Sequence, residues 1–350
     1  MNISVTDQLP LFTNEIVAKY SDHRRPKSFG RSLFTEVETA TKLASFLSQR
    51  GLNLIASDVA RGSRGSLNVF DKSTQSTVLP PYFNEFFNIT ELDSYDALAV
   101  DGVNAKIAWG RFLDDVATKM MYCMDKIDRR YELQCWQLLL TGIVTINNGQ
   151  NVQYGRQSGS LVNPGAGNYW ADANVDPFTS FERGATWLNE TGKMAGNTIM
   201  VIFGQSAWKD YTNNTAVKSR NLWINNNMDM IADKAIVNST GGTFKGVTTV
   251  GAFNYEFWVY PDFYETEAGT KIQYVDTKKI VMIPAEMRSQ TLTYTAVPQR
   301  IVPGQTPAKG KFLVWNAVSE FNDAEFMGAK SAGIPTLVAV DQVYTEQVVS

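Results

Sequence analysis

Apolar residues recur at spacings of three and four between about residue 111 and residue 141, which is the pattern of an amphipathic helix. The apolar positions are Leu113, Val116, Met120, Met124, Ile127, Tyr131, Cys135 and Leu138. From Arg111 onward, neither proline nor glycine occurs until Gly142. We therefore predict one helix of about thirty residues, roughly 45 Å long at 1.5 Å per residue, whereas helices in globular domains average about 11–12 residues.

Charged residues fill the positions between the apolar ones. They are Asp114, Asp115, Lys119, Asp125, Lys126, Asp128, Arg129, Arg130 and Glu132. Opposite charges fall three or four residues apart, which stabilises the surface of a helix. We predict that the apolar stripe lies across a sheet while the charged flank faces water. A coiled coil is the competing interpretation, but the chain offers no second heptad segment as its partner.

Two extended segments, 59–70 and 77–88, flank a polar tip at residues 71–75. The first segment is poor in apolar residues and contains Gly62 and Gly65. A two-stranded hairpin without a hydrophobic face is only marginally stable in water. We therefore expect this projection to lie on another surface, although an ordinary loop on a larger sheet explains the same pattern equally well.

Strand and helix signals alternate irregularly in the second half of the chain. Asp176 and Pro177 are typical of the start of a helix, and residues 197–204 predict a short buried strand. A further helix is expected from Ser206 to about Tyr211, and the C-terminal segment has the apolar character of strands. This pattern predicts the α+β class.

The first fifty residues mix apolar and polar positions without a clean period. Pro26 and Gly30 interrupt any helix there, so we interpret this segment as an arm. We favour a solvated arm, or one that contacts an acidic face of a neighbouring molecule, over contact with nucleic acid. The basic cluster on which these alternatives depend consists of His23, Arg24, Arg25 and Lys27.

Composition and charge narrow the range of functions. Hydrophobic residues make up 44% of the 350 residues, enough to bury a core. The 32 Lys and Arg against 35 Asp and Glu give a net charge of −3, whereas a protein that grips phosphates along its length is expected to be basic. We expect no signal peptide, because the start of the sequence lacks a basic region followed by an apolar core. We expect no membrane span, because no run of about 18 apolar residues occurs.

The residue types also exclude several kinds of catalytic site. A single histidine, His23, removes Ser-His-Asp systems and multi-histidine metal sites. Cys123 and Cys135 are roughly 18 Å apart along the predicted helix, too far to form a disulfide, and are expected to be apolar fillers in a reducing compartment. The glycines of segments 163–170 and 304–312 do not match nucleotide-binding motifs. We therefore expect no cofactor and no metal.

Paired carboxylates leave one enzymatic alternative, a glycoside hydrolase. Its candidates are Asp323 with Glu325, and Asp114 with Asp115, although the latter two point about 100° apart on a helix. The aromatic segment 253–265 could line the cleft of such an enzyme or of a sugar-binding tail or adhesin protein. A strand with one buried face explains its alternation more simply.

Four stretches, taken in order, resemble one known family. They are ARGSRG at 60–65, YWADANVDPFTSFE at 169–182, IMVIFGQSAWKDYTNNTAVKSR at 199–220 and EFMGAKSAGIPTLVAVDQVYTEQVV at 325–349. Together they resemble the lambda-type major capsid proteins of tailed phages, the major capsid protein E family, which have the Hong Kong 97-type fold. The resemblance is collinear over most of residues 50–350 and weaker in the arm.

The resemblance implies a division of the chain. Residues 1–50 would be the N-terminal arm, and 51–95 the extended loop. The peripheral domain would comprise 96–175 and 305–332, with the helix at about 111–141 as its spine. The axial domain would comprise 176–304 and 333–350.

The resemblance also implies a function. The chain would be a non-enzymatic structural protein that self-assembles into hexamers and pentamers of an icosahedral shell around double-stranded DNA. Scaffold, portal and decoration proteins would be its partners, with assembly in the host cytoplasm and final location in the virion. No covalent cross-linking is expected. Contacts between subunits would involve Arg61, Arg64 and Lys72 of the loop, and contacts of the arm with a neighbour or with DNA would involve Arg24, Arg25 and Lys27.

Overall fold

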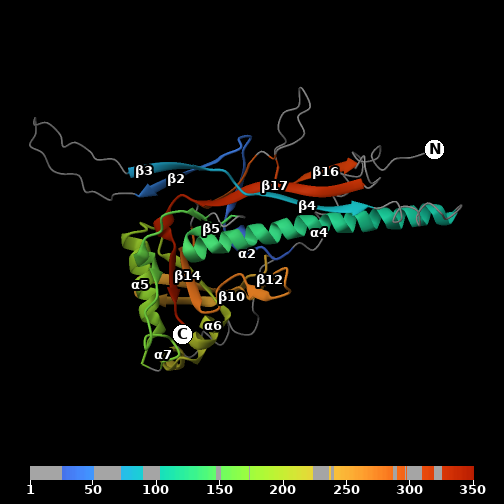
Figure 1. Cartoon of the computed structure of the whole chain (residues 1–350). Coiled ribbons are helices and arrows are strands. Elements are labelled where there is room, and N and C mark those ends of the chain that lie inside the picture. The colour runs from blue at the N-terminus through green and yellow to red at the C-terminus, as the bar shows by residue number, and fades with distance from the viewer. Residues whose placement is uncertain are drawn as a thin grey trace, which may run out of the picture.

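A computed structural model places an elongated layer on top of a more compact body (Figure 1). It describes residues 26–50, 72–89, 103–146, 151–172, 174–223, 236–237, 240–286, 290–295, 297, 310–318 and 325–350. The elongated layer contains a long helix and a five-stranded sheet, and the compact body contains a seven-stranded sheet with three helices. Helix and strand are therefore mixed, as the sequence predicts.

The long helix, α4, spans Val103–Thr141. Its 39 residues correspond to about 58 Å. The predicted end at Gly142 is confirmed, but the predicted start near Arg111 is wrong by eight residues, because the helix continues through Gly110. One glycine inside a helix costs only about 1 kcal/mol relative to alanine, which does not end a long helix.

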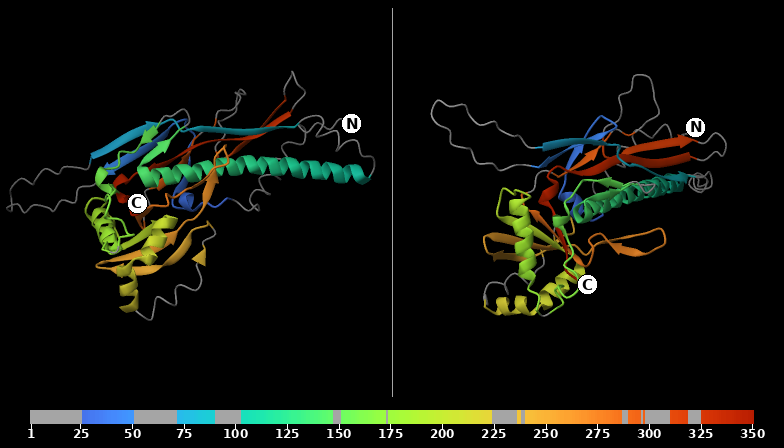
Figure 2. Two further views of the ribbon diagram at one scale, coloured as in Figure 1. Left: turned by 60° about the horizontal axis from the view of Figure 1, so that its bottom comes forward. Right: turned by 60° about the vertical axis from the view of Figure 1, so that its left-hand side comes forward.

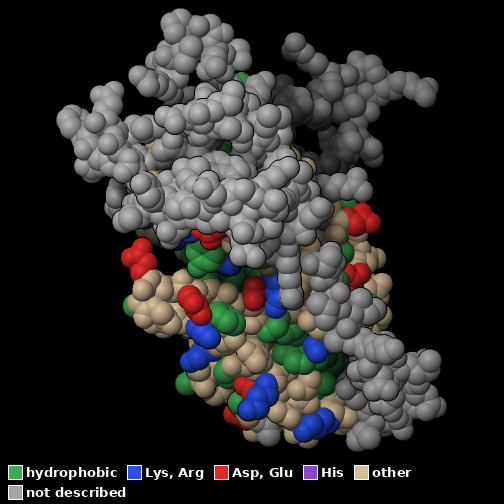
Figure 3. All heavy atoms as spheres, turned by 90° about the vertical axis from the view of Figure 1, so that its right-hand side faces the viewer, with side chains coloured by type: hydrophobic (Ala, Val, Ile, Leu, Met, Phe, Trp, Pro, Cys, Tyr) green, Lys and Arg blue, Asp and Glu red, His purple; other side chains and the backbone are tan. Residues whose placement is uncertain are grey.

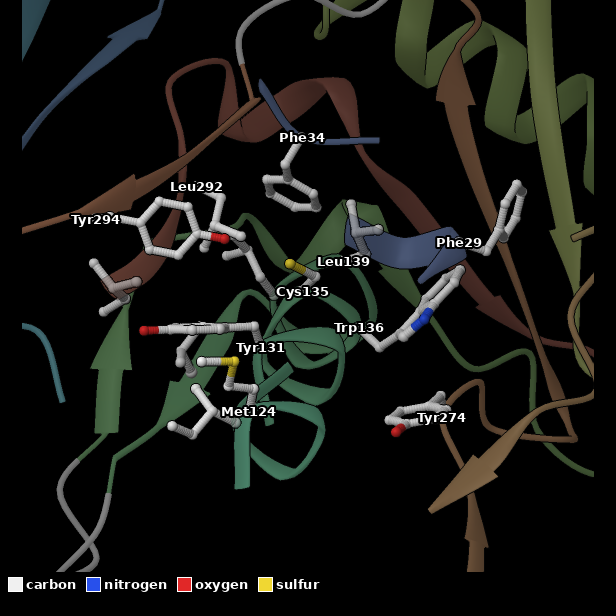
Figure 4. Close-up of a cluster of buried hydrophobic side chains, with 14 of the residues drawn as sticks. Phe29, Phe34, Met124, Tyr131, Cys135, Trp136, Leu139, Tyr274, Leu292 and Tyr294 are labelled. Atoms are coloured by element: carbon white, nitrogen blue, oxygen red, sulfur yellow. The ribbon is translucent and has the colours of Figure 1, made fainter. Parts of the chain in front are cut away.

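The predicted apolar stripe of α4 is confirmed along the part of the helix whose side chains are described. Seven of its members are buried, namely Val116, Met120, Met124, Ile127, Tyr131, Cys135 and Leu138. They pack against the five-stranded sheet, where the Tyr131 ring contacts the rings of Phe83 and Tyr294 edge-on at 5.3 and 5.4 Å. Figure 4 shows Tyr131, Tyr294 and Met124 in this core. Burial of this stripe, more than helix propensity, stabilises so long a helix.

The five-stranded sheet is organised around β17, Glu325–Leu337. Residues 325–332 of β17 pair with β4, Tyr82–Ile89, and residues 325–330 also pair with β16, Leu313–Val318. From Gly333 onward β17 pairs instead with β15, Gln290–Tyr294, which in turn pairs in parallel with β1, Thr35–Glu38. A single strand therefore belongs to two sets of neighbours, one on each side of Ala332.

The seven-stranded sheet has the order β7-β18-β14-β8-β11-β10-β9. Its strands are Leu161–Val162, Tyr344–Gln347, Lys279–Pro284, Thr198–Phe203, Phe253–Val259, Thr243–Val250 and Ile236–Val237. The predicted buried strand is β8, and the aromatic segment is β11, with Tyr255, Phe257 and Val259 buried on one face. This confirms the strand interpretation of the aromatic alternation.

Three helices accompany this sheet: α5, Pro177–Glu190; α6, Gln205–Asn213; and α7, Thr215–Trp223. The predicted start of α5 is confirmed, because the Asp176 side chain accepts a hydrogen bond from Phe178 N at 3.0 Å. Phe181 of α5 packs edge-on against Phe203 of β8, at 6.2 Å between ring centroids, and Tyr211 of α6 joins the same aromatic core. The compact body therefore has a core of its own.

A hairpin of β2, Ala44–Arg50, and β3, Lys72–Val78, extends beyond the five-stranded sheet at the end opposite the start of α4, while Ala44 and Val78 at its base pack into the core (Figures 1 and 2). The predicted tip at 71–75 is wrong, because residues 72–75 lie in β3. The first predicted segment, 59–70, lies outside the described residues, and the second, 77–88, is extended in the end of β3 and in β4. The predicted second arm is interrupted at Pro80 and Pro81, because proline cannot donate to a ladder.

Short elements complete the described part of the chain. They are α2, Phe29–Ser32; the hairpin of β5, Ile143–Thr145, with β6, Asn151–Gln153; the hairpin of β12, Phe263–Glu265, with β13, Lys271–Gln273; and the 3-10 turns η2, Ser158–Ser160, and η3, Val340–Gln342. The single turn of α2 lies between α4 and the compact body, where Phe29 contacts both.

Candidate functional site

A buried carboxylate on α4 holds two cations from distant parts of the chain. The Asp128 Oδ1 atom lies 2.7 Å from Arg31 Nη1 and 2.8 Å from Lys311 Nζ. Only 3% of the Asp128 side chain is exposed. Burial by itself would raise the pKa of this carboxyl, but Arg31 and Lys311 outweigh burial and hold its pKa below the ordinary value. Asp128 therefore ties α2 and the segment before β16 to the middle of α4.

Glu36 on β1 supplies a second carboxylate for the two cations, Arg31 and Lys311, that lie beside Asp128. Its Oε1 atom lies 3.3 Å from Arg31 Nη2 and accepts a hydrogen bond from the Tyr294 hydroxyl at 3.1 Å. The junction thus contains two cations and two carboxylates, contributed by α2, β1, α4 and the segment before β16. We call Arg31, Glu36, Asp128 and Lys311 the ionic junction.

A second buried carboxylate, Glu132, lies one turn further along α4 and caps α2. It accepts hydrogen bonds from the backbone N–H groups of Gly30 at 2.7 Å and Arg31 at 2.8 Å, and from Trp136 Nε1 at 2.8 Å. Burial raises the pKa of Glu132, and the three hydrogen bonds only partly oppose this effect. A side chain from α4 therefore satisfies the first N–H groups of a helix that is distant in the sequence.

Phe29 fills the space beside the ionic junction. Its ring stacks on Trp258 of β11 at 5.4 Å and lies 5.6 Å from Tyr260 and 6.2 Å from Trp136 of α4. Figure 4 shows Phe29 next to Trp136, with Tyr274 on the other side of the indole. The ring therefore joins the long helix to the seven-stranded sheet.

The burial of Asp125, Asp128 and Glu132 corrects the prediction that the whole charged flank of α4 faces water. The residues after Pro26, together with Lys311, cover this flank. Asp128 and Glu132 are like charges four residues apart, which is unfavourable on an isolated helix and could have indicated outside partners. No spacing in the sequence identifies those partners, because they come from both ends of the chain.

Aromatic side chains form a second feature, on the side of the five-stranded sheet that faces away from α4. Along β4, Phe83 and Phe87 pack toward the core while Tyr82 and Phe86 are exposed, Phe86 to 55%. The Phe86 ring lies 6.0 Å from Trp315 and 6.0 Å from Phe326. Exposed apolar groups gathered in this way are typical of an interaction surface. We call Tyr82, Phe86, Trp315 and Phe326 the outer aromatic face.

Polar contacts fix the central indole of this face. Trp315 Nε1 donates to Asn84 Oδ1 at 2.9 Å, and Lys330 Nζ lies over the indole ring at 4.5 Å from its centroid. The sequence analysis did not identify this face. The exposed aromatics at alternate positions of β4 carry the signal, but β16 and β17 supply the other members from more than two hundred residues away.

The residues predicted for contacts between subunits are only partly described. Arg24, Arg25, Arg61 and Arg64 lie outside the described residues. Lys72 is at the end of β3, directly opposite Arg50 of β2. Lys27 Nζ lies 3.6 Å from Asp262 of the same chain, with 46% of its side chain exposed.

The carboxylates of the enzymatic alternative do not form a site in the described part of the chain. Asp115 forms an exposed ion pair with Lys119 at 2.8 Å, Glu325 is the first residue of β17, and Asp323 lies outside the described residues. No three His, Cys, Asp or Glu side chains in the described ranges are grouped so that they could hold a metal ion. None of the described helices is both long and apolar enough to cross a membrane.

Seen from the right-hand side of Figure 1, the described surface below the grey atoms carries charges of both signs (Figure 3). Acidic and basic side chains alternate there with hydrophobic ones, without a broad basic patch on the visible described part of this face. This agrees with the net charge of −3.

Comparison with known proteins places this architecture in a family. The sequence profile of the family described as phage major capsid protein E matches residues 18–340. The chain belongs to the phage major capsid protein E family. This major capsid protein is a shell component of a tailed phage, and the family resemblance predicted from the four sequence stretches is confirmed.

Solved structures show that the capsid protein has the Hong Kong 97-type fold. A protein assigned as a prophage capsid protein from E. coli CFT073 superimposes with a TM-score of 0.66 at 15% identity, covering 98% of both chains. A phage-related protein from Bordetella bronchiseptica RB50 gives 0.55 at 11% identity, covering 95% of this chain and 96% of the other. The capsid of a native GTA particle gives 0.50 at 10% identity, with 93% and 91% covered. None of the curated proteins compared with the chain matches it.

Proposed function

We propose that this capsid protein assembles into hexamers and pentamers, and that these close into an icosahedral shell around a double-stranded DNA genome. The observation that carries the proposal is the family match over residues 18–340. The elongated shape of the subunit supports it, because such a shape offers long edges for contact with neighbouring copies. The helix α4 stiffens a long flat layer, and the hairpin of β2 and β3 is anchored in the core at its base and extends beyond the five-stranded sheet (Figure 2). Such a hairpin is marginal alone and gains stability when it lies on another copy.

The outer aromatic face is a surface on which another copy would pack. Its exposed rings are stabilised by burial, at roughly 25 cal/mol per Å² of apolar area removed from water. Each contact of this kind is weak by itself. Once one contact between two subunits has formed, it raises the effective concentration for their other contacts, so that several weak contacts together make a closed shell stable.

The outer end of the hairpin is proposed to contact a carboxylate on the neighbouring subunit. Arg50 and Lys72 occupy directly opposite positions, and Arg61 and Arg64 belong to the segment between them in the sequence. Like charges at opposite positions of two antiparallel strands are unfavourable unless a partner of opposite charge compensates them. Contacts of Arg24, Arg25 and Lys27 with a neighbour or with DNA are part of the same proposal.

The proposed domain boundaries follow the family resemblance. The change of partner of β17 between Ala332 and Gly333 supports a division there between peripheral and axial domains. We also propose an N-terminal arm that ends before Ala44 and an extended loop that begins with β2, because β2 pairs with β3.

Further partners and the place of assembly belong to the proposal as well. Scaffold, portal and decoration proteins would bind the shell, assembly would take place in the host cytoplasm, and no enzymatic role is proposed. The small negative charge supports weak, non-specific contact with packaged DNA, because strong binding to the inner wall would oppose packaging.

Sedimentation velocity of the purified chain over a hundredfold range of concentration tests self-assembly. The proposal predicts capsomers and larger particles whose fraction rises with concentration. A single monomeric species at every concentration would contradict it. An assay for glycoside hydrolysis on the same preparation is expected to show no activity.

A further inference from the structure

We infer that residues 26–38 form a clamp that fixes the angle between α4 and the seven-stranded sheet, and that this angle sets the curvature of the shell. The second half of this inference depends on the proposed assembly, whereas the first half concerns the single chain. We call residues 26–38 the clamp.

The clamp begins on the compact body. Ser28 N donates to Thr240 O at 3.0 Å, and Lys27 forms its ion pair with Asp262 at 3.6 Å. The Phe29 ring then stacks on Trp258 of β11. These contacts hold the first residues of the clamp against the seven-stranded sheet and the loop that follows β11.

The next residues of the clamp are bonded to α4. Glu132 accepts from the N–H groups of Gly30 and Arg31, and Asp128 pairs with the Arg31 guanidinium. There is no room for adjustment here, because a Cβ atom added to Gly30 would lie 2.5 Å from Trp136 Nε1. Only glycine allows the backbone of the clamp to approach α4 this closely.

The clamp ends in the five-stranded sheet. Thr35–Glu38 pair in parallel with β15, and Thr39 N, the next residue, donates to Tyr294 O at 2.8 Å. Within about a dozen residues the chain therefore contacts the compact body, α4 and the sheet above α4 in succession. A second segment, Tyr154 to Arg156, also contacts β17, α4 and β18, but it does so at the C-terminal end of the helix, beyond Asp128 and Glu132.

Direct contacts between α4 and the compact body are concentrated at the C-terminal turns of the helix. The Trp136 and Tyr260 rings stack at 5.6 Å, and the Thr345 hydroxyl donates to Leu139 O at 3.1 Å. Because these contacts lie near one end of α4, they alone would allow the helix to rotate relative to the compact body. The clamp contacts α4 at Asp128 and Glu132 as well, and these contacts oppose that rotation. We expect the angle between α4 and the seven-stranded sheet to vary when the contacts of the clamp are weakened.

The clamp is expected to be either fully seated or fully released. Without it, Glu132 would lose two backbone donors and Asp128 would lose one of its two cations, both in a buried position. Buried polar groups left without partners are costly, so partly seated states are unfavourable. The angle between α4 and the seven-stranded sheet is therefore expected to take two discrete values, one with the clamp seated and one with it released.

The test compares Glu132→Gln, which keeps the volume of the side chain, and Phe29→Leu with the control Asp115→Asn on the exposed side of α4. Hydrogen exchange followed by mass spectrometry reports on the clamp in the purified chain, and electron microscopy reports the diameters of its particles. Both clamp variants are expected to exchange the amides of Gly30 and Arg31 at least tenfold faster than the control, and to give a broader distribution of diameters.

Different outcomes reject different parts of the account. Exchange at Gly30 and Arg31 equal to that of the control would show that Glu132 and Phe29 do not hold the clamp. Faster exchange with unchanged particle diameters would reject its role in curvature. If the unaltered chain forms no particles, the proposed assembly fails, while the exchange result still decides whether the clamp exists.

Discussion

The guanidinium of Arg31 lies 2.7 Å from the carboxylate of Asp128, which joins the segment before β1 to the middle of α4. Lys311 approaches the same oxygen from the other end of the sequence, at 2.8 Å. The long helix is therefore more than a stiff rod on a sheet. It is also the place where two segments that are far apart in the sequence, around Arg31 and Lys311, are fastened together.

Replacing Asp128 by Asn is expected to lower the free energy of unfolding by about 3–5 kcal/mol, because two buried cations would lose their carboxylate. The exposed pair of Asp115 with Lys119 provides the control, and Asp115→Asn is expected to cost about 0–1 kcal/mol. Denaturant unfolding of both purified variants measures the difference. Equal losses would mean that the ionic junction contributes nothing beyond a surface ion pair.

Glu132 gives a prediction about pH. Because its pKa is raised in the folded chain, the fold holds this proton more tightly than the unfolded chain does. Its contribution to stability is fully present below the ordinary value of 4.5 and is lost as pH rises through the folded pKa. The free-energy difference between the unaltered chain and Glu132→Gln should therefore shrink from pH 4.5 upward. A difference that grows with pH would contradict the raised pKa.

The sequence predicted the elements that depend on neighbours in the chain. The stripe of α4 follows from residues three or four positions apart and the cap at Asp176 from the adjacent proline, and both are confirmed. The tip of the hairpin was misplaced because β2 and β3 are poor in alternating apolar residues, so no local pattern fixed their register. The ionic junction was missed because its members are brought together only by packing, and a charged helical residue usually faces water.

Arg156 is expected to be a strong determinant of stability at the C-terminal end of α4. Its guanidinium donates to the carbonyl oxygens of Leu139 at 2.7 Å, Ser160 at 2.9 Å and Val343 at 2.9 Å. Arg156→Met should cost about 3 kcal/mol, since these buried acceptors lose their donor. Thermal unfolding against the exposed control Lys119→Met measures the effect. A shift no larger than that of the control would show that water replaces the guanidinium without loss.

Two glycines with similar φ angles allow the cost of a strained backbone to be measured separately from the cost of a crowded Cβ atom. Gly142 has φ +71° and Gly155 has φ +70°, but a Cβ atom would lie 2.6 Å from Arg156 Cδ at Gly142 and would meet nothing within 4 Å at Gly155. Gly155→Ala should cost about 1 kcal/mol through the left-handed backbone alone. Gly142→Ala should cost at least about 1 kcal/mol more, as overpacking does. Equal unfolding free energies for the two variants would contradict the close contact.

The outer aromatic face gives a prediction about assembly. Phe86→Ser removes an exposed ring from the outer aromatic face, and Phe263→Ser removes a ring of 43% exposure from β12. Neither change should alter the fold greatly, because both rings are largely exposed. Sedimentation velocity is expected to show a higher fraction of unassembled chain for Phe86→Ser only. Matching profiles for the two variants would remove this face from the proposed contacts.

Electron cryomicroscopy of the expressed chain tests most directly whether it builds a shell on its own. The account predicts closed particles with rings of five and six copies, each copy showing α4 within the wall and its hairpin of β2 and β3 lying over a neighbour. Isolated molecules whose hairpin is folded back onto their own five-stranded sheet would contradict it.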